Sequence, residues 1–307
     1  MIKNYSFHRV EKCNMCASKT FRIIGKRLNN PQGFFPQKKT GISVTIKKCN
    51  HCNLIFSDPQ PIPESLSNHY GVLPEHYWKE EYFVVNDNYF KTEIDWLKKI
   101  KTIEPGMKSL DIGAGIGKQM ISLKNIGFDA HGIEPSSEFR ERALNKMGVP
   151  QDKLQLASIE DAMFDEKSFD FISFGVVLEH IYNPHEALKK AISWLKDDGI
   201  IHLEVPNSNW LIGKLINFSY HIRGLDYVGN LSPMHTPYHL HEFDLKSFQE
   251  NGKINGFDVF DYKYFVCQTY MPPVLDHLTR FWMKTFKNQG MQLSVMLKKS
   301  FDAQYSK

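Results

Sequence analysis

Residues 109–118 read Ser109-Leu-Asp-Ile-Gly-Ala-Gly-Ile-Gly-Lys118, and this stretch decides the fold. Its apolar beginning predicts a strand, and the residues after it predict a helix. The loop between them has three glycines at alternate positions, Gly113, Gly115 and Gly117. Glycine lets the backbone approach a ligand closely, and the N–H groups at the start of a helix bind anionic or polar groups. The stretch therefore predicts a strand, a loop and a helix that together hold a nucleotide-like ligand.

The next predicted strand supplies an acid at a characteristic distance. This strand ends in His131-Gly-Ile-Glu-Pro-Ser136. Glu134 thus lies about twenty residues after the loop, where dinucleotide-binding folds have a ribose-binding acid. The glycine spacing, G-x-G-x-G led by Asp111, differs from the G-x-G-x-x-G of dinucleotide dehydrogenases. We therefore expect a ligand that has a ribose but is not NAD(H).

The motifs continue with Leu156-Ala-Ser-Ile-Glu-Asp161, Ser168-Phe-Asp-Phe-Ile-Ser-Phe174 and Val177-Leu-Glu-His-Ile181. The whole series, over about 100–300, resembles the class I S-adenosylmethionine (SAM) methyltransferases. The resemblance implies that Glu134 accepts both ribose hydroxyls and that Asp111 and the loop contact the methionine end. Ser158 stands where this family often has an acid, so the backbone of Ile159 is expected to serve there. The SAM-binding residues implied in this way are Asp111, Gly113, Gly115, Glu134, Pro135, Ser158, Ile159, Phe174 and Tyr82.

Strands and helices alternate through this region, so the fold class is α/β with a parallel sheet covered by helices. We predict a Rossmann-like seven-stranded methyltransferase sheet with a small N-terminal zinc-ribbon domain and a lid insertion. The predicted strands are 107–112, 129–134, 154–157, 169–174, 199–205, 256–267 and 291–298. The predicted helices are 86–102, 116–126, 136–147, 184–197, 244–252 and 272–287.

Two C-x-x-C knuckles near the N-terminus predict a metal site. Cys13, Cys16, Cys49 and Cys52 can close tetrahedrally around Zn²⁺, and strand-like runs flank a turn between the knuckles. Disulfides and a redox pair are the alternatives, and a structural zinc site explains the ribbon-like spacing better than either. His51 is expected to be a surface neighbour of the ligands. With the proline-rich segment and the tyrosines that follow, the pattern resembles zinc-ribbon methyltransferases that act on sugars and other small metabolites. In those enzymes aromatic residues of this segment lie over the SAM pocket, which makes Tyr77 and Tyr82 candidates for that role. The alternative is that both tyrosines only pack the domain junction.

The expected domains are a zinc ribbon with a stiff proline linker (1–63), an aromatic and helical connector (64–104) and the methyltransferase domain (105–300). A lid insertion is expected at 208–242. Its histidines, His235, His239 and His241, could bind a metal, contact substrate or precede the cap of the next helix. The sugar C-methyltransferases have a further domain after the sheet, whereas this sequence ends soon after it. We therefore expect the ribbon, the Tyr-rich segment and the lid to hold the acceptor.

Glu179 and His180 follow the fourth predicted strand and are the candidate catalytic residues. Ligands bind at the carboxyl ends of parallel strands, so both are expected beside the transferred methyl group. Histidine has an ordinary pKa near 6.5, which suits a general base at neutral pH. His180 is therefore the candidate base, with Glu179 orienting it or joining a metal site. The alternative is that His180 only braces the turn before Asn183.

Composition sets the remaining expectations. Residues 1–53 have eleven Lys/Arg and one acid, a basic segment that would suit an anionic partner. No apolar run is long enough to span a bilayer and the N-terminus lacks a signal-peptide core, so we expect a cytosolic protein with no membrane contact. The leading function is SAM-dependent methylation of a hydroxyl or carbon of a small molecule, a sugar, nucleotide-linked sugar or glycan precursor. The alternative is an RNA methyltransferase with a basic zinc lobe, although no Asn-Pro-Pro-Tyr-like signature is present. Helix 272–287 is expected to cover the lid or to form a homodimer face.

Overall fold

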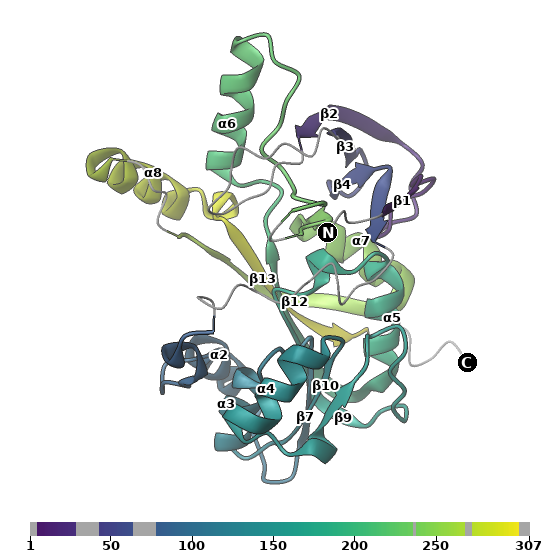
Figure 1. Ribbon diagram of the computed structural model, residues 1–307, viewed down its shortest axis with the longest axis vertical. Helices are drawn as coiled ribbons and strands as arrows, with labels where there is room; N and C mark the ends of the chain where they lie inside the picture. Colours follow the sequence, from purple (N-terminus) through teal and green to yellow (C-terminus); the bar gives the residue numbers. More distant parts are fainter. Residues whose placement is uncertain (1–4, 29–42, 64–77, 236–237, 268–271, 301–307) are drawn as a thin grey trace. The chain divides into compact units, whose positions relative to one another are not determined.

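The computed structural model (Figure 1) describes residues 5–28, 43–63, 78–235, 238–267 and 272–300. Within them the chain divides into two compact units, and each is described by itself. The first unit is built from Pro63–Gly175 and Ala187–His202. The second joins Tyr5–Ile62, Val176–Glu186 and Leu203–Lys307. The N-terminal segment therefore shares a unit with later segments.

The predicted seven-stranded sheet is confirmed, with strand order β12-β13-β10-β9-β6-β7-β8. Strands β6, β7, β8 and β9 pair in parallel, whereas β12 and β13 pair antiparallel. The strands are β6 (Lys108–Ile112), β7 (Asp129–Glu134), β8 (Leu154–Leu156), β9 (Phe169–Gly175), β10 (Leu195–Pro206), β12 (Phe257–Phe265) and β13 (Gln292–Lys299). This order and direction are those of a Rossmann-like methyltransferase sheet.

In the first unit, α3 (Lys118–Asn125) and α4 (Ser137–Met147) lie against β7 (Figure 1). Gly117 precedes α3 with φ 79°, and a Cβ there would lie 2.5 Å from Cγ2 of Val149. Only glycine meets both conditions without strain, so the third glycine of the loop serves helix packing. The unit also contains η2 (Glu80–Phe83), α2 (Lys91–Ile100), η3 (Gln151–Lys153) and most of α5 (Pro184–Trp194).

The second unit contains a four-stranded antiparallel sheet in the order β11-β4-β3-β2. Its strands are β2 (Phe21–Leu28), β3 (Ser43–Cys49), β4 (Ile55–Asp58) and β11 (His241–Glu242). A further pair of strands is formed by β1 (Tyr5–His8) and β5 (Gln60–Pro63). The prediction of a stiff linker over 54–63 is therefore wrong. Although this segment has three prolines, its residues around Phe56 are buried and pair on both sides.

The lid is partly helical, as predicted, and packs within the second unit. It begins with α6 (Leu211–Ile222), and its later residues Val228, Leu231 and Met234 are buried against β3 and β4. Its last residues form β11, which extends the ribbon's sheet. The second unit also has η4 (Leu178–His180), α7 (Leu245–Asn255), α8 (Pro273–Thr285) and η5 (Lys287–Gln289). No helix in the described parts of the chain combines the length and apolarity of a membrane span.

Candidate functional site

The glycine loop is held open by the neighbouring strand. The backbone N–H groups of Gly113 and Ala114 both donate to the carbonyl oxygen of Ile133, at 2.9 and 3.0 Å. Gly113 and Gly115 have φ values of 70° and 56°, in the left-handed region that glycine adopts without cost. The loop therefore turns away from β6 in a shape that hydrogen bonds to β7 maintain.

Glu134 closes the same site from the end of β7. Its Oε2 accepts the N–H of Gly115 and its Oε1 accepts the N–H of Ser136, both at 2.8 Å. Burial raises the pKa of Glu134, and the two backbone hydrogen bonds oppose that shift. Each carboxylate oxygen has a second acceptor direction, so a ribose with two hydroxyls fits this residue. The acid thus fixes the loop, and its remaining acceptor directions could hold a ligand.

Asp111 lies beneath the loop in a network that the sequence did not reveal. Its Oδ1 accepts from the side-chain amide of Gln119 at 2.9 Å and from the hydroxyl of Ser173 at 3.2 Å. Burial raises the pKa of Asp111 to about 8; the hydrogen bond from Ser173 lowers it and the nearby charge of Glu134 raises it. A cationic ligand group close to Asp111 would reverse this effect of burial.

The other predicted SAM contacts differ in what their side chains can reach. Ser158 accepts from the backbone of Asp161 and donates to its carboxylate, so its hydroxyl caps a turn. Ile159 and Phe174 are buried in the core, and the carbonyl of Ile159 accepts from the ammonium of Lys190 at 3.1 Å. Pro135 is exposed beside Glu134.

Tyr82 packs against the start of α3. The ammonium of Lys118 lies 4.6 Å from the centre of the Tyr82 ring, and Trp78 contacts the same ring edge-on at 5.8 Å. Trp78 also packs on Phe139 of α4, whose ring lies near Gly115. The aromatic segment therefore adjoins the glycine loop, and a contact between Tyr82 and SAM stays a prediction. Tyr77 lies outside the described residues.

The four predicted zinc ligands come together in the second unit. Their Sγ atoms all lie within 4.8 Å of one another, with Cys13 and Cys52 at 3.5 Å and Cys16 and Cys49 at 3.6 Å. All four are free thiols, and a disulfide would need sulfurs about 2 Å apart. Zn–S bonds of about 2.3 Å in a tetrahedron place sulfurs about 3.8 Å apart, so the donor set fits Zn²⁺. Burial raises the pKa of Cys16, a cost that a bound cation would offset.

Side chains of helix α7 hydrogen-bond both C-x-x-C knuckles. The side-chain amide of Asn251 donates to the carbonyl of Met15 at 2.7 Å, and the Ser247 hydroxyl donates to that of Cys52 at 2.9 Å. His51 is exposed and hydrogen-bonds Glu250 of the same helix, so it is a surface neighbour, as expected. Side chains of α7 thus attach the knuckles to the rest of the unit through the knuckles' backbone carbonyls.

Glu179 and His180 meet one histidine of the lid. Oε1 of Glu179 lies 4.0 Å from Nε2 of His180 and 3.8 Å from Nε2 of His239. Burial raises the pKa of Glu179 to about 8 and lowers that of His180 to about 4 and that of His239 to about 3. The sequence predicted a His180 that titrates near neutral pH, and the structure instead makes it a weak base.

The three lid histidines do not gather around one point. His235 lies against Arg27, with 3.3 Å between Nε2 and Nη2, and His241 is buried against Gln60 at 3.1 Å. Only His239 reaches Glu179. The three histidines therefore do not form one metal site by themselves, and sequence reasoning missed the pairing of His239 with Glu179.

A cavity of about 490 Å³ lies within the second unit, and His239 lines it. Three cations also line it, Arg27, Lys48 and Lys214, together with the carboxylate of Glu242. Glu242 is already held by Asn230 and by the backbone of Leu231. Among the described residues none of the three cations forms an ion pair, and Nε of Arg27 is buried without a hydrogen-bond partner. The cavity therefore suits a small molecule with an anionic group.

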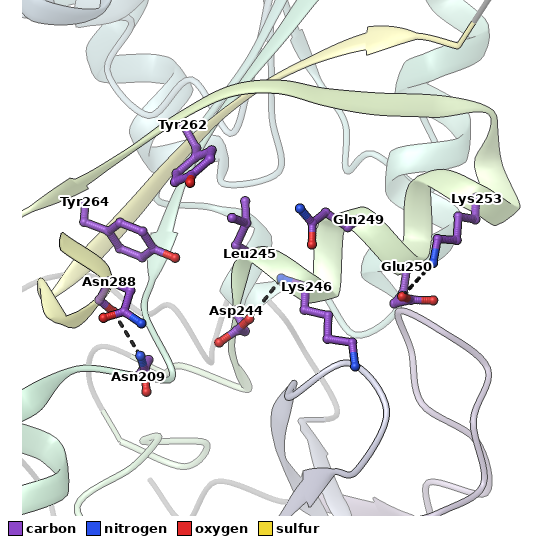
Figure 2. A pocket seen from close by; sticks show the side chains of 10 residues that line it. All are labelled: Asn209, Asp244, Leu245, Lys246, Gln249, Glu250, Lys253, Tyr262, Tyr264 and Asn288. Atoms are coloured by element: carbon purple, nitrogen blue, oxygen red, sulfur yellow. Dashed lines mark hydrogen bonds and ion pairs between the residues drawn. The ribbon is translucent and has the colours of Figure 1, made fainter. Parts of the chain in front are cut away.

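A second hollow, of about 600 Å³, is drawn in Figure 2. Tyr262 and Tyr264 project from β12 on one side of it, and the first turns of α7 form the other side. Its charged groups are engaged locally, since Glu250 pairs with Lys253 at 2.8 Å. No buried, unpartnered group among the described residues points to chemistry here.

Comparisons with known proteins agree with this geometry. A family model described as a methyltransferase domain matches residues 86–261. A ubiquinone biosynthesis O-methyltransferase of Coxiella burnetii (strain Dugway 5J108-111) is 27% identical over 159 residues, 50% of this chain and 66% of that protein. The enzyme of the same name from Glaesserella parasuis is 28% identical over 138 residues, 43% of this chain and 56% of that protein. The chain thus spans less than two thirds of both relatives.

Among solved structures, a chain from the complex between the Haloferax volcanii Trm112 methyltransferase activator and a methyltransferase superposes with a TM-score of 0.52. It is 16% identical, and the match covers 77% of this chain and 98% of that one. At this identity the likeness concerns the fold alone.

Proposed function

Because the chain belongs to the family of methyltransferase domains, we propose that it transfers the methyl group of SAM to a hydroxyl oxygen of a small molecule. The observation that carries the proposal is the carboxylate of Glu134, fixed at the end of β7 by the N–H groups of Gly115 and Ser136. A buried carboxylate with one acceptor direction left on each oxygen matches the paired hydroxyls of a ribose. Bound SAM supplies an electrophilic methyl group on its sulfonium.

The protein's share of the reaction is binding and positioning. Glu134 and the glycine loop hold the cofactor, and Asp111 lies where it can face the cationic methionine end. Rate enhancement in such a displacement comes largely from holding the reacting atoms in line. We assign the removal of the acceptor hydroxyl's proton to the cluster of Glu179, His180 and His239.

We place the acceptor in the cavity lined by His239. Val176, which also lines it, directly follows Gly175 at the end of β9 in the chain. The name of the bacterial relatives favours a hydroxyl acceptor. The cations Arg27, Lys48 and Lys214 favour an acceptor with a phosphate, such as a sugar phosphate or nucleotide-linked sugar. Zinc in the Cys13 cluster is proposed as structural, because four thiolates leave no open position.

The test is a methyl-transfer assay with labelled SAM on hydroxyl-bearing acceptors with and without phosphate, and on RNA. We expect label in a phosphate-bearing small molecule. Lys48→Gln should raise the KM for that acceptor about tenfold, because a charge-assisted contact contributes about 1.5 kcal/mol or more. Lys26→Gln, which removes an exposed lysine of β2, is the matched control and should leave KM unchanged. Label in RNA alone would overturn the proposal and favour the basic zinc lobe as an RNA-binding surface.

A further inference from the structure

Glu179 is a buried carboxylate without a hydrogen-bond partner among the described residues. Its side chain is fully buried, and neither oxygen has a hydrogen bond among the described residues. An isolated carboxylate in such a place is costly unless a proton or a cation neutralises it. A proton or a cation is therefore expected at these two oxygens, and the groups around them favour one of the two.

Two imidazoles face this carboxylate. The Nε2 atoms of His180 and His239 lie 4.0 and 3.8 Å from Oε1 of Glu179, and the three donor atoms lie within 4.8 Å of one another. Nδ1 of His180 lies 3.2 Å from the carbonyl oxygen of Tyr238, to which it donates. In the neutral ring this places the lone pair on Nε2, the nitrogen turned toward Glu179.

The backbone fixes the three residues relative to one another. The N–H of Leu240 donates to the carbonyl of Glu179 at 2.9 Å, which joins the lid to η4. The backbone of His239 is held on both sides by Ser232, through its carbonyl at 3.1 Å and its N–H at 3.2 Å. The three side chains thus extend from two segments whose backbones are tied together.

We infer that Glu179, His180 and His239 bind a divalent first-row transition-metal ion, at a site separate from the four cysteines. Two imidazoles and one carboxylate are the donor set of catalytic zinc and non-haem iron sites, which keep positions open for other ligands. Bonds of about 2.1 Å in a tetrahedron place donors about 3.4 Å apart, so Oε1 of Glu179 needs to move about half an ångström closer to each imidazole. The two imidazoles, whose donor atoms lie within 4.8 Å of each other, need to move closer by at most about 1.4 Å. The nitrogen donors disfavour Mg²⁺ and Ca²⁺, which prefer oxygen.

The ion would deepen the proposed function, and this step alone rests on that function. His239 lines the acceptor cavity, so an open position on its side is available to a hydroxyl oxygen. A metal-bound hydroxyl has a lowered pKa and releases its proton to water. The oxygen then forms a bond to the methyl carbon as the carbon–sulfur bond breaks, and the sulfonium becomes a neutral thioether. Because water accepts the proton in this arrangement, His180 does not need to act as a base.

Binding is tested without cofactor or acceptor, so its outcome is independent of methyl transfer. Protein whose cysteine cluster is filled with Zn²⁺ is dialysed against Co²⁺, and bound metal is counted by elemental analysis. We expect one Co²⁺ per chain with a spectrum that lacks thiolate charge transfer. Glu179→Gln and His239→Ala should weaken Co²⁺ binding at least about 100-fold and leave Zn²⁺ in place. His221→Ala, which removes an exposed histidine of α6, is the matched control and should bind like the wild type.

A thermal measurement separates binding from a structural role. Co²⁺ should raise the melting temperature of the wild type and not that of Glu179→Gln, because a ligand stabilises only a state that binds it. The metal-free Glu179→Gln protein should melt close to the temperature of the wild type, since an amide of the same shape replaces the buried carboxyl group. Equal Co²⁺ binding by wild type and Glu179→Gln, no Co²⁺ bound at all, or a thiolate spectrum would each overturn the inference.

Discussion

Replacing Glu134 by glutamine isolates the contact that defines the SAM site. The change keeps the shape of the side chain and turns one acceptor oxygen into an amide donor. In the structure each oxygen already accepts one backbone N–H at 2.8 Å, from Gly115 and from Ser136. The glutamine can still accept from one of these groups, so the loop loses one hydrogen bond and the ribose loses its charged acceptor.

The expected loss follows from those contacts. One hydrogen bond to a charged group contributes about 1.5–3 kcal/mol, which corresponds to about a 10- to 150-fold weaker affinity for SAM. Glu134→Ala removes both acceptors and leaves two loop N–H groups without a partner, so it should bind SAM more weakly still and melt at a lower temperature. The demethylated product should show the same losses, because the ribose is common to both molecules.

Isothermal titration calorimetry with SAM and with its demethylated product measures these affinities. Glu160→Gln is the matched control, because this acid is exposed and the substitution leaves the loop intact. Unchanged affinity in both Glu134 variants would refute the reasoning, since the ribose would then be held elsewhere. Weakened binding in the Glu160 control as well would assign the effect to overall charge instead.

Three further predictions concern single residues. Burial raises the pKa of Asp111 to about 8, and a cationic ligand favours its ionised form. SAM should therefore bind about tenfold tighter at pH 9 than at pH 7, and calorimetry should show proton release on binding. An affinity for SAM that does not change with pH, or the same pH dependence in Asp111→Asn, would contradict this. Cys49→Ser should abolish zinc in elemental analysis and loosen β2 and β3 in hydrogen exchange, and a folded, active wild type without zinc or iron would exclude the site. Gly117→Ala should destabilise by about 1–3 kcal/mol in urea unfolding, and Val149→Ala should recover part of the loss; additive effects would mean that the 2.5 Å approach is relieved at no cost.

Local patterns were enough to predict the first unit. β7 has the predicted bounds, and β6, α3, α4, β8 and β9 differ by one or two residues at either end, because apolar runs between turn residues specify them directly. α2 begins five residues later than predicted and β10 begins four residues earlier. The same reasoning located Glu134 and the glycine loop, whose roles depend on short stretches of chain. The network around Asp111 was missed, since Gln119 and Ser173 reach it only after helix and strand have packed.

Non-local pairing accounts for the errors in the second unit. Three prolines made residues 54–63 look like a linker, but β4 is a buried strand because β3 and β11 pair with it. A two-residue strand such as β11 has no pattern of its own. For the same reason the spacing of the lid histidines could not show that only His239 meets Glu179. A contact between residues far apart in the sequence leaves no periodic signal in either segment.

The pairing of β4 with β11 also has a consequence for how the protein is made. The last strand of the ribbon's sheet comes from His241–Glu242, so the ribosome must synthesise most of the chain before that sheet is complete. Until then β4 is an open edge of Ile55–Asp58, the kind of surface on which nascent chains pair wrongly. The four clustered cysteines, Cys13, Cys16, Cys49 and Cys52, all precede β4. Metal binding by these cysteines would stabilise the early strands during that interval. The supply of metal during translation, and not only in the finished enzyme, is therefore expected to set the yield of correctly folded protein.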